Sequence, residues 1–113
     1  MIISVVIPCL NESETIAICI KKSIKQIKLL KIKGEVIVAD NGSIDGSIEI
    51  AKKNGAKVIN VKEKGYGAAL RAGFSAAKGK YIIMGDGDDS YDFNFINKFY
   101  QKIEKGYDLV QGC

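Results

Sequence analysis

Three carboxylates stand within four residues, at Asp86, Asp88 and Asp89, directly after the apolar run 81–84. Like charges this close repel one another unless a positive charge lies among them. A divalent cation such as Mg²⁺, Mn²⁺ or Ca²⁺ is the simplest partner, because these hard ions prefer oxygen ligands. Gly87 allows the backbone to bend and a ligand to come close. The cluster therefore predicts a metal and phosphate site at the carboxyl end of a central, buried strand.

The same stretch allows other interpretations. Asp92 stands just before an expected helix, where a capping role is the better interpretation. An EF-hand loop is excluded, because it needs glycine where Tyr91 stands. A haloacid-dehalogenase-like phosphatase would use Asp86 as its nucleophile and Asp88 as its acid or base. That family places the motif on its first strand and needs a later lysine and further acids, so this alternative ranks second.

Polar residues also follow the earlier apolar runs. Asp40 ends the second run, where a carboxylate can accept hydrogen bonds from a base edge or a ribose. Glu12 follows the first run across Pro8, and a ligand role and a first-turn helix acid are equally good interpretations. We expect Asp45 to cap the helix that follows it and Arg71 to form a surface ion pair.

Strand-like and helical patterns alternate along the chain. The expected strands are 2–7, 35–40, 56–61, 81–84 and the beginning of a fifth at 108–110, and the expected helices are 14–30, 47–54, 68–78 and 93–105. Ser13 is the expected N-cap of the first helix, and Gly55 is expected to end the second. The glycines and alanines of 65–73 indicate a helix packed closely on the sheet, because neither the Rossmann nor the P-loop spacing is met.

This alternation predicts a single α/β domain over residues 1–113, a mostly parallel, Rossmann-like sheet with helices on both faces. In such a sheet, ligands bind outside the carboxyl ends of the strands, near a switch in strand order. The loops 8–12, 40–45 and 86–92 would meet at that edge. We therefore expect the polar residues of these three loops to form one site.

The composition excludes several classes of site and partner. Among 113 residues there are three cysteines without CxxC spacing and no histidine, which excludes zinc and imidazole chemistry and fits a reducing compartment. We interpret the net charge of +4 as a solvated, lysine-rich helix face, with a weak pull on anionic ligands or an anionic membrane surface as the alternative. Basic and aromatic residues are not interleaved, so no nucleic acid partner is expected. No signal peptide and no transmembrane segment are expected.

Four segments in order carry a family resemblance. They read VVIPCLNE at 5–12, VIVADNGSIDG at 36–46, GYGAALRAG at 65–73 and YIIMGDGDDS at 81–90. Together they resemble family 2 glycosyltransferases of the GT-A fold, and the last is most similar to the polyprenyl-phosphate, dolichol-phosphate mannosyltransferase-like branch. The resemblance covers essentially the whole chain. It implies a UDP- or GDP-sugar donor, an inverting transfer and a polyprenyl phosphate as the expected acceptor.

The resemblance also implies roles for particular residues. By match of motif, Asp86 and Asp88 are the DxD acids that hold Mg²⁺ or Mn²⁺ on the donor diphosphate, and Ser90 completes the metal shell. Leu10 stands where the family often has tyrosine, and Asn41 replaces the second aspartate of its usual Asp-Asp-Gly-Ser. The residues expected to bind the nucleotide sugar are Pro8, Leu10, Glu12, Asp40, Asp86, Gly87 and Asp88.

The chain is expected to be the N-terminal, donor-binding half of a longer domain. The family's acceptor-binding half and its usual general base would lie beyond Cys113, so no catalytic residue is assigned here. The expected setting is the cytoplasm, at the cytoplasmic face of a membrane, in the synthesis of cell-envelope glycans. The alternative from another class is a non-catalytic remnant or interaction module that keeps the fold without the chemistry.

Overall fold

The computed structural model describes residues 3–84, in which strands and helices alternate. The strands are β1 (Ile3–Cys9), β2 (Gly34–Asp40), β3 (Lys57–Asn60) and β4 (Tyr81–Met84), and the helices are α1 (Ile16–Leu29), α2 (Ser47–Lys53) and α3 (Tyr66–Ala76). The order of elements agrees with the alternation predicted from the sequence. The helix and strand expected at 93–105 and 108–110 lie outside the described residues.

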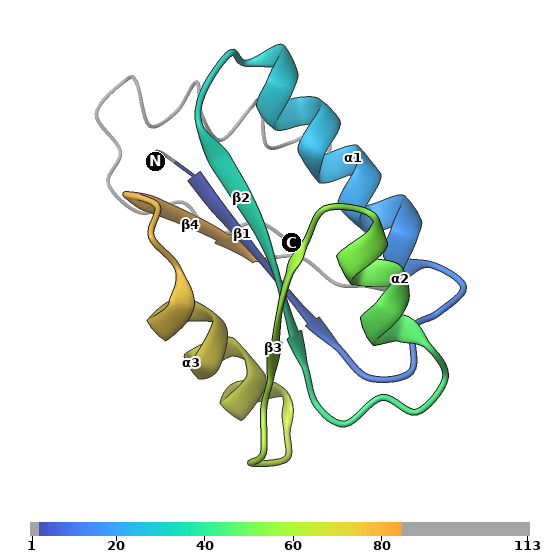
Figure 1. Ribbon diagram of the computed structural model, residues 1–113. Helices are drawn as coiled ribbons and strands as arrows, with labels where there is room; N and C mark the ends of the chain where they lie inside the picture. The colour runs from blue at the N-terminus through green and yellow to red at the C-terminus, as the bar shows by residue number, and fades with distance from the viewer. Residues whose placement is uncertain (1–2, 85–113) are drawn as a thin grey trace.

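The described strands form one parallel sheet in the order β3-β2-β1-β4. Figure 1 shows α1 and α2 on one side of this sheet and α3 on the other. The predicted fold class is therefore confirmed. From β1 the chain builds outward through β2 and β3, and then places β4 on the other side of β1. Strand order thus reverses beside β1, which is where sheets of this kind bind ligands.

β1 is buried along almost its whole length. Its side chains Ile3, Val5 and Ile7 share one hydrophobic cluster with Ile16 and Ile20 of α1. A strand that is covered on both faces needs a continuous apolar run and not an alternating one. This explains the run of β-branched residues, which only Ser4 interrupts, and confirms that the run forms a central strand.

α3 lies close against the opposite face of the sheet. A Cβ atom at Gly73 would collide with the side chain of Val6 on β1. Ala68 and Ala69, one turn earlier, are buried. The small residues of this helix therefore let its backbone approach the sheet, as its composition predicts.

The start of α1 differs from the prediction. Ser13 was expected as the N-cap, but the helix begins at Ile16 and Thr15 occupies the N-cap position without a side-chain capping bond. Ser13 instead donates its backbone N–H to Asp45 Oδ2 at 3.0 Å. The prediction was wrong because a carboxylate from another loop holds this segment outside the helix.

The end of α2 agrees with the prediction, whereas the burial of β4 does not. Gly55 follows α2 with a φ of +93°, and its N–H donates to the Lys52 carbonyl at 3.2 Å, so the predicted glycine stop is confirmed. β4 is less buried than a central strand would be, since only Ile83 among its residues is buried. Within the described part of the sheet, β4 pairs with β1 alone.

A polar clamp fastens the other edge of the sheet, at the amino ends of the strands. Ser4 Oγ donates to Glu35 Oε2 at 2.6 Å, and the same oxygen accepts the Lys78 N–H at 2.7 Å. Gly79 donates its N–H to Ser4 Oγ at 2.8 Å. Burial raises the pKa of Glu35, but the hydrogen bonds from Ser4 and Lys78 outweigh it and leave the pKa below its ordinary value.

None of the described helices is both long and apolar enough to cross a membrane.

Candidate functional site

The loops that follow β1, β2 and β3 surround a cavity of about 810 Å³ at the carboxyl edge of the sheet. The end of β1 contributes Pro8 and the loop after it contributes Leu10 and Glu12, which are three of the residues predicted to bind a nucleotide sugar. The third loop contributes Lys62 and Lys64. The cavity therefore combines an apolar wall with two cations, at the edge where a ligand is expected.

Hydrogen bonds between side chains and backbone fasten the first loop to the second. The Asn11 N–H donates to Ser43 Oγ at 2.9 Å, and Asn11 Oδ1 accepts the Ile44 N–H at 2.9 Å. The Glu12 N–H donates to Ser47 Oγ at 3.0 Å. Asn11 holds a φ of +52°, a left-handed conformation that asparagine tolerates better than most residues. These bonds fix the backbone that carries Leu10 and Glu12 into the cavity.

Asp45 strengthens the same junction. Its carboxylate accepts the backbone N–H of Ser13 at 3.0 Å and that of Ser47 at 3.1 Å, and it also accepts the Ser47 hydroxyl. The bond from the Ser47 hydroxyl is the main reason that the pKa of Asp45 falls to about 2. The prediction that Asp45 caps α2 was wrong in its position, because Gly46 occupies the N-cap and no side-chain capping bond is formed. Asp45 bonds instead from the residue before the cap, and it links the start of α2 to the first loop.

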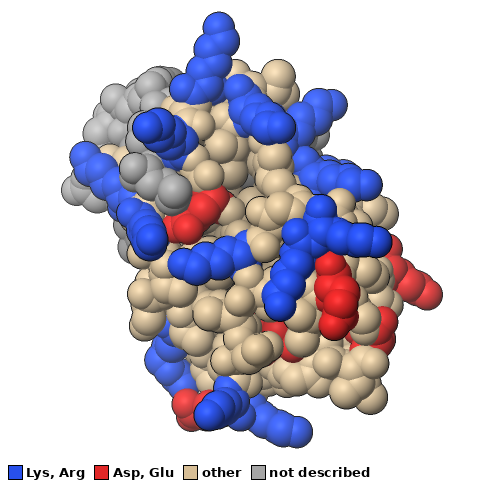
Figure 2. All heavy atoms as spheres, viewed as in Figure 1, with Lys and Arg blue, Asp and Glu red and all other residues tan. Residues whose placement is uncertain are grey.

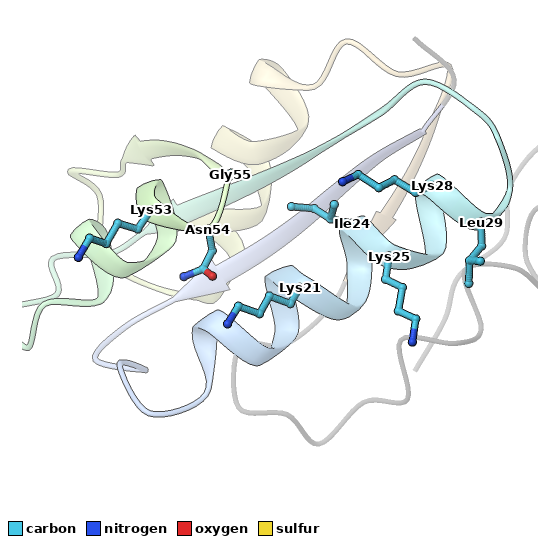
Figure 3. A pocket seen from close by; sticks show the side chains of 8 residues that line it. All are labelled: Lys21, Ile24, Lys25, Lys28, Leu29, Lys53, Asn54 and Gly55. Carbon is cyan, nitrogen blue, oxygen red and sulfur yellow. The ribbon is translucent and has the colours of Figure 1, made fainter.

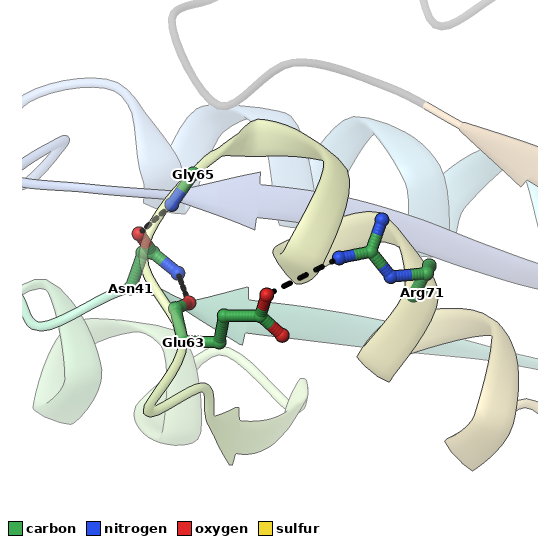
Figure 4. Close-up of polar contacts among 4 residues, drawn as sticks. All are labelled: Asn41, Glu63, Gly65 and Arg71. Carbon is green, nitrogen blue, oxygen red and sulfur yellow. Dashed lines mark hydrogen bonds and ion pairs between the residues drawn. The ribbon is translucent and has the colours of Figure 1, made fainter.

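Asn41 connects the second loop to the third. Figure 4 shows its amide between two backbone groups, with Nδ2 donating to the Glu63 carbonyl at 3.0 Å and Oδ1 accepting the Gly65 N–H at 3.0 Å. Arg71 lies beside this loop and pairs with the Glu63 carboxylate, with Nη2 and Oε1 3.7 Å apart. The surface ion pair predicted for Arg71 is confirmed. Because both side chains are largely exposed, the pair contributes little stability.

Asp40 ends β2, directly before the cavity-lining residues Asn41 and Gly42, and is 1% exposed. Its Oδ2 accepts the backbone N–H groups of Gly42 at 3.0 Å and Ser43 at 2.9 Å, which shapes the turn after β2. Its Oδ1 is buried and has no hydrogen-bond partner among the described residues. An unpaired carboxylate oxygen in such a position is costly, so it favours the approach of an additional donor. The role predicted for Asp40 in nucleoside binding stays a prediction.

Cys9 lies in the wall of the cavity but has no nucleophilic character. Its side chain is 2% exposed, and Sγ is 3.9 Å from Ser43 Oγ. Burial raises the pKa of the Cys9 thiol, which keeps it protonated. Among the described residues, Cys9 therefore does not act as an activated nucleophile in this cavity.

The predicted metal ligands cannot be placed in this cavity. Asp86, Gly87, Asp88 and Ser90 lie outside the described residues, as do Asp89 and Asp92. Within residues 3–84 there is no group of three or more His, Cys, Asp or Glu side chains that could hold a metal ion. The acidic cluster thus stays a prediction, although the last described residue of β4, Met84, pairs with Val6 of β1, the strand that leads into the first loop of the cavity.

Two kinds of residue at this edge escaped the sequence analysis. Lys62 and Lys64 line the cavity, and Asn11 and Asn41 hold its loops together. The two lysines had an available signal, since their loop also follows a strand and must reach the same edge of a parallel sheet. The two asparagines had none, because their partners are backbone groups of distant loops.

A parallel sheet with a polar cavity at the switch in strand order defines an α/β domain of the nucleotide-binding type. The chain belongs to glycosyl transferase family 2, whose family profile matches residues 4–113. The suspected resemblance is thereby confirmed. The match also favours a glycosyltransferase over the phosphatase alternative that used Asp86 as nucleophile.

Individual relatives agree with this assignment. The low-salt glycan biosynthesis hexosyltransferase Agl6 of Haloferax volcanii is 44% identical over 111 residues, which are 97% of this chain and 27% of Agl6. A dolichyl-phosphate hexose transferase of the same organism is 40% identical over 80 residues, or 71% of this chain and 35% of that protein. The chain thus spans only about a quarter to a third of these curated relatives.

A solved structure extends the comparison to a bound state. Glucosyl-3-phosphoglycerate synthase of Mycobacterium tuberculosis, in complex with Mn²⁺, UDP-glucose and phosphoglyceric acid, superposes with a TM-score of 0.74 at 28% identity. The match covers 93% of this chain and 40% of the synthase. The described fold is therefore the N-terminal part of a GT-A glycosyltransferase fold.

Proposed function

We propose that this chain is the donor-binding part of an inverting glycosyltransferase and binds a UDP- or GDP-sugar in the cavity between its first three loops. The observation that carries the proposal is the cavity itself, which lies at the switch in strand order and presents Lys62 and Lys64 to an incoming anion. The synthase of M. tuberculosis that shares this fold was crystallised with a nucleotide sugar.

The described residues divide the work of binding by their chemistry. Pro8 and Leu10 supply an apolar wall on which a flat base can lie. Asp40 shapes the turn after β2, and this turn carries Asn41 and Gly42 into the wall of the cavity beside the proposed nucleoside. Lys62 and Lys64 attract the diphosphate. The Glu12 carboxylate can accept hydrogen bonds from the hydroxyls of the ribose.

We further propose that Asp86 and Asp88, with Ser90, hold Mg²⁺ or Mn²⁺. Two carboxylates and a hydroxyl form an all-oxygen donor set, which suits these hard cations. Such a metal, when bound, offsets the negative charge that grows on the leaving diphosphate. The proposal gains support from the Mn²⁺ held by the related synthase.

The sugar acceptor and the general base of the transfer complete the proposed reaction. We propose a polyprenyl phosphate as acceptor, with support from the similarity to a dolichyl-phosphate hexose transferase. A reaction at such a lipid would place the protein at the cytoplasmic face of a membrane, in the assembly of cell-envelope glycans. The carboxylate that deprotonates the acceptor would come from beyond Cys113.

Isothermal titration calorimetry with UDP, GDP and their sugars, with and without Mn²⁺, tests the donor site. We expect removal of the metal to weaken binding at least about tenfold, because a metal on a diphosphate contributes several kcal/mol. Asp88→Ala should produce the same loss, whereas Asp92→Ala, the matched change at an expected helix cap, should keep metal-dependent binding. Metal-independent or absent binding, in a chain whose circular dichroism shows it folded, would contradict the proposal.

The alternatives give different results in the same set of variants. A non-catalytic remnant predicts that Asp88→Ala leaves nucleotide affinity unchanged. A phosphatase predicts turnover of an aryl phosphate that Asp86→Asn abolishes. Either result would replace the glycosyltransferase assignment for this chain.

A further inference from the structure

We propose that the outward face of α1 docks on a bilayer that contains anionic phospholipid. We call it the α1 lysine face and define it by Ile18, Lys21, Lys25, Lys28 and Leu29. The inference rests on this helix and the groove beside it, and it does not depend on the nucleotide site.

The α1 lysine face is a single stripe on the helix surface. Residues 18, 21, 25, 28 and 29 are spaced by three, four and seven positions, so their side chains emerge on one side. The opposite side carries Ile16, Ile20 and Ile27, which are buried in the core. The stripe is therefore the side of α1 that the fold leaves to the outside.

Two aliphatic side chains on this stripe lie in solvent. Leu29 is 64% exposed and Ile18 is 43% exposed. They lie about three turns of helix apart, or roughly 16 Å at the α-helical rise, with the lysines between them. One surface of a bilayer can accept both kinds of group, because aliphatic side chains enter between the headgroups while lysines stay beside the phosphates.

Positive charge surrounds the stripe. The segment 21–33 holds six lysines and no acidic residue. A groove of about 770 Å³ runs between α1 and the end of α2, and Lys21, Lys25, Lys28 and Lys53 line it. In Figure 2, basic side chains predominate over the upper part of the visible face, where Figure 1 places α1.

The distribution of these cations favours a bilayer over a small anion or an acidic peptide. Figure 3 shows the Lys25 side chain pointing away from those of Lys21 and Lys28, so the three ammonium groups do not converge on one point. A single phosphate would need converging donors, and a peptide would leave the separated Ile18 and Leu29 without a matching surface. An anionic bilayer offers charge over an area and accepts aliphatic side chains between its headgroups, while lysine stems reach toward the phosphates.

Co-sedimentation with vesicles tests the proposal on the full chain. We expect binding to vesicles of equimolar phosphatidylcholine and phosphatidylglycerol, and none to phosphatidylcholine alone. Each lysine near an anionic surface contributes about fivefold in partitioning, so Lys21→Gln/Lys25→Gln/Lys28→Gln should bind about 100-fold more weakly. Leu29→Ser should lower binding by about threefold through the lost apolar contact, without any change in charge.

The matched control is Lys57→Gln/Lys78→Gln/Lys80→Gln, which also lowers the net charge from +4 to +1. Lys57 begins β3, and Lys78 and Lys80 lie in the segment between α3 and β4, so none of the three belongs to α1. The control should keep most of the binding. Equal losses of vesicle binding in both triple variants would mean that net charge alone attracts the chain. Capture by polyglutamate without any binding to vesicles would mean an acidic protein partner. Either result overturns the proposal.

Discussion

Asn41 uses both ends of its amide to hold one loop against another. Nδ2 donates to the Glu63 carbonyl, and Oδ1 accepts the Gly65 N–H. An aspartate, which the family often has at this position, could keep the second bond but would face the carbonyl with an oxygen instead of a donor. In this chain the asparagine therefore has a positioning role that the sequence alone did not reveal.

We predict that Asn41→Asp destabilises the third loop. The lost bond and the new oxygen–oxygen repulsion should lower the free energy of unfolding by about 1 kcal/mol. The nucleotide affinity should fall at the same time, because Lys62 and Lys64 lie on the displaced loop. Urea unfolding and calorimetry with UDP measure the two effects.

Asn54→Asp provides the matched control, since Asn54 Nδ2 also donates to a backbone carbonyl, that of Ile50 at 2.8 Å, but lies at the end of α2 and not in the wall of the cavity. It should lower the free energy of unfolding by a similar amount and leave the affinity for UDP unchanged. If Asn41→Asp instead bound UDP more tightly than the parent chain, residue 41 would contact the base directly and the bridge would have little effect.

At the scale of elements, much of the fold follows from the sequence. The continuous β-branched run predicted a strand covered on both faces, and β1 is such a strand. The carboxyl-edge rule predicted that Leu10 and Glu12 share a site, and both line the cavity. The start of α1 could not be predicted, because a bond across 32 residues, from the Ser13 N–H to Asp45, competes with the local helix signal.

Close approach between elements was equally invisible in the sequence, and Gly79 shows why. A Cβ atom there would lie 2.6 Å from the Ser4 nitrogen and 2.7 Å from the Ile3 carbonyl carbon, both backbone atoms of β1. The position needs glycine because two chain segments touch, and not because of a turn conformation. Nothing in the local pattern Lys78-Gly79-Lys80 records which segment lies beside it.

We predict that Gly79→Ala lowers the free energy of unfolding by about 3 kcal/mol, at the upper end of the cost of overpacking, because backbone atoms cannot move aside as a side chain can. Gly67→Ala is the control in α3, where the new Cβ would meet only Arg71 Nη1 at an ordinary 3.4 Å. That change should stabilise by about 0.5–1 kcal/mol through helix propensity. Similar midpoints of urea unfolding for the two variants would contradict the close approach at Gly79.

At the scale of the whole molecule, carboxylates fasten both edges of the sheet. Asp45 joins the first two loops at the carboxyl edge, and Glu35 joins β2 to the turn before β4 at the amino edge. Hydrogen bonds lower the pKa of Asp45 to about 2 and hold that of Glu35 below its ordinary value, against the effect of burial. Both groups therefore bind protons more weakly in the folded chain than in the unfolded one.

Linkage then sets the direction of the pH dependence. A carboxyl group with a lowered pKa stabilises the fold above the pKa of the unfolded chain, and this stabilisation disappears as the pH falls through the folded pKa. We predict that the midpoint of urea unfolding is constant from pH 7 to about pH 5 and falls between about pH 4.5 and pH 2. Circular dichroism across this range measures it.

The double variant Glu35→Gln/Asp45→Asn should be less stable than the parent chain at pH 7, because a neutral amide oxygen is a weaker acceptor than a carboxylate and because Asp45 accepts donors on both of its oxygens. Its stability should fall less steeply below about pH 4.5, since the two groups that released their protons on folding are gone. The two curves should therefore converge in acid. Parallel curves would mean that other carboxylates, and not the two that fasten the edges of the sheet, determine how this fold responds to acid.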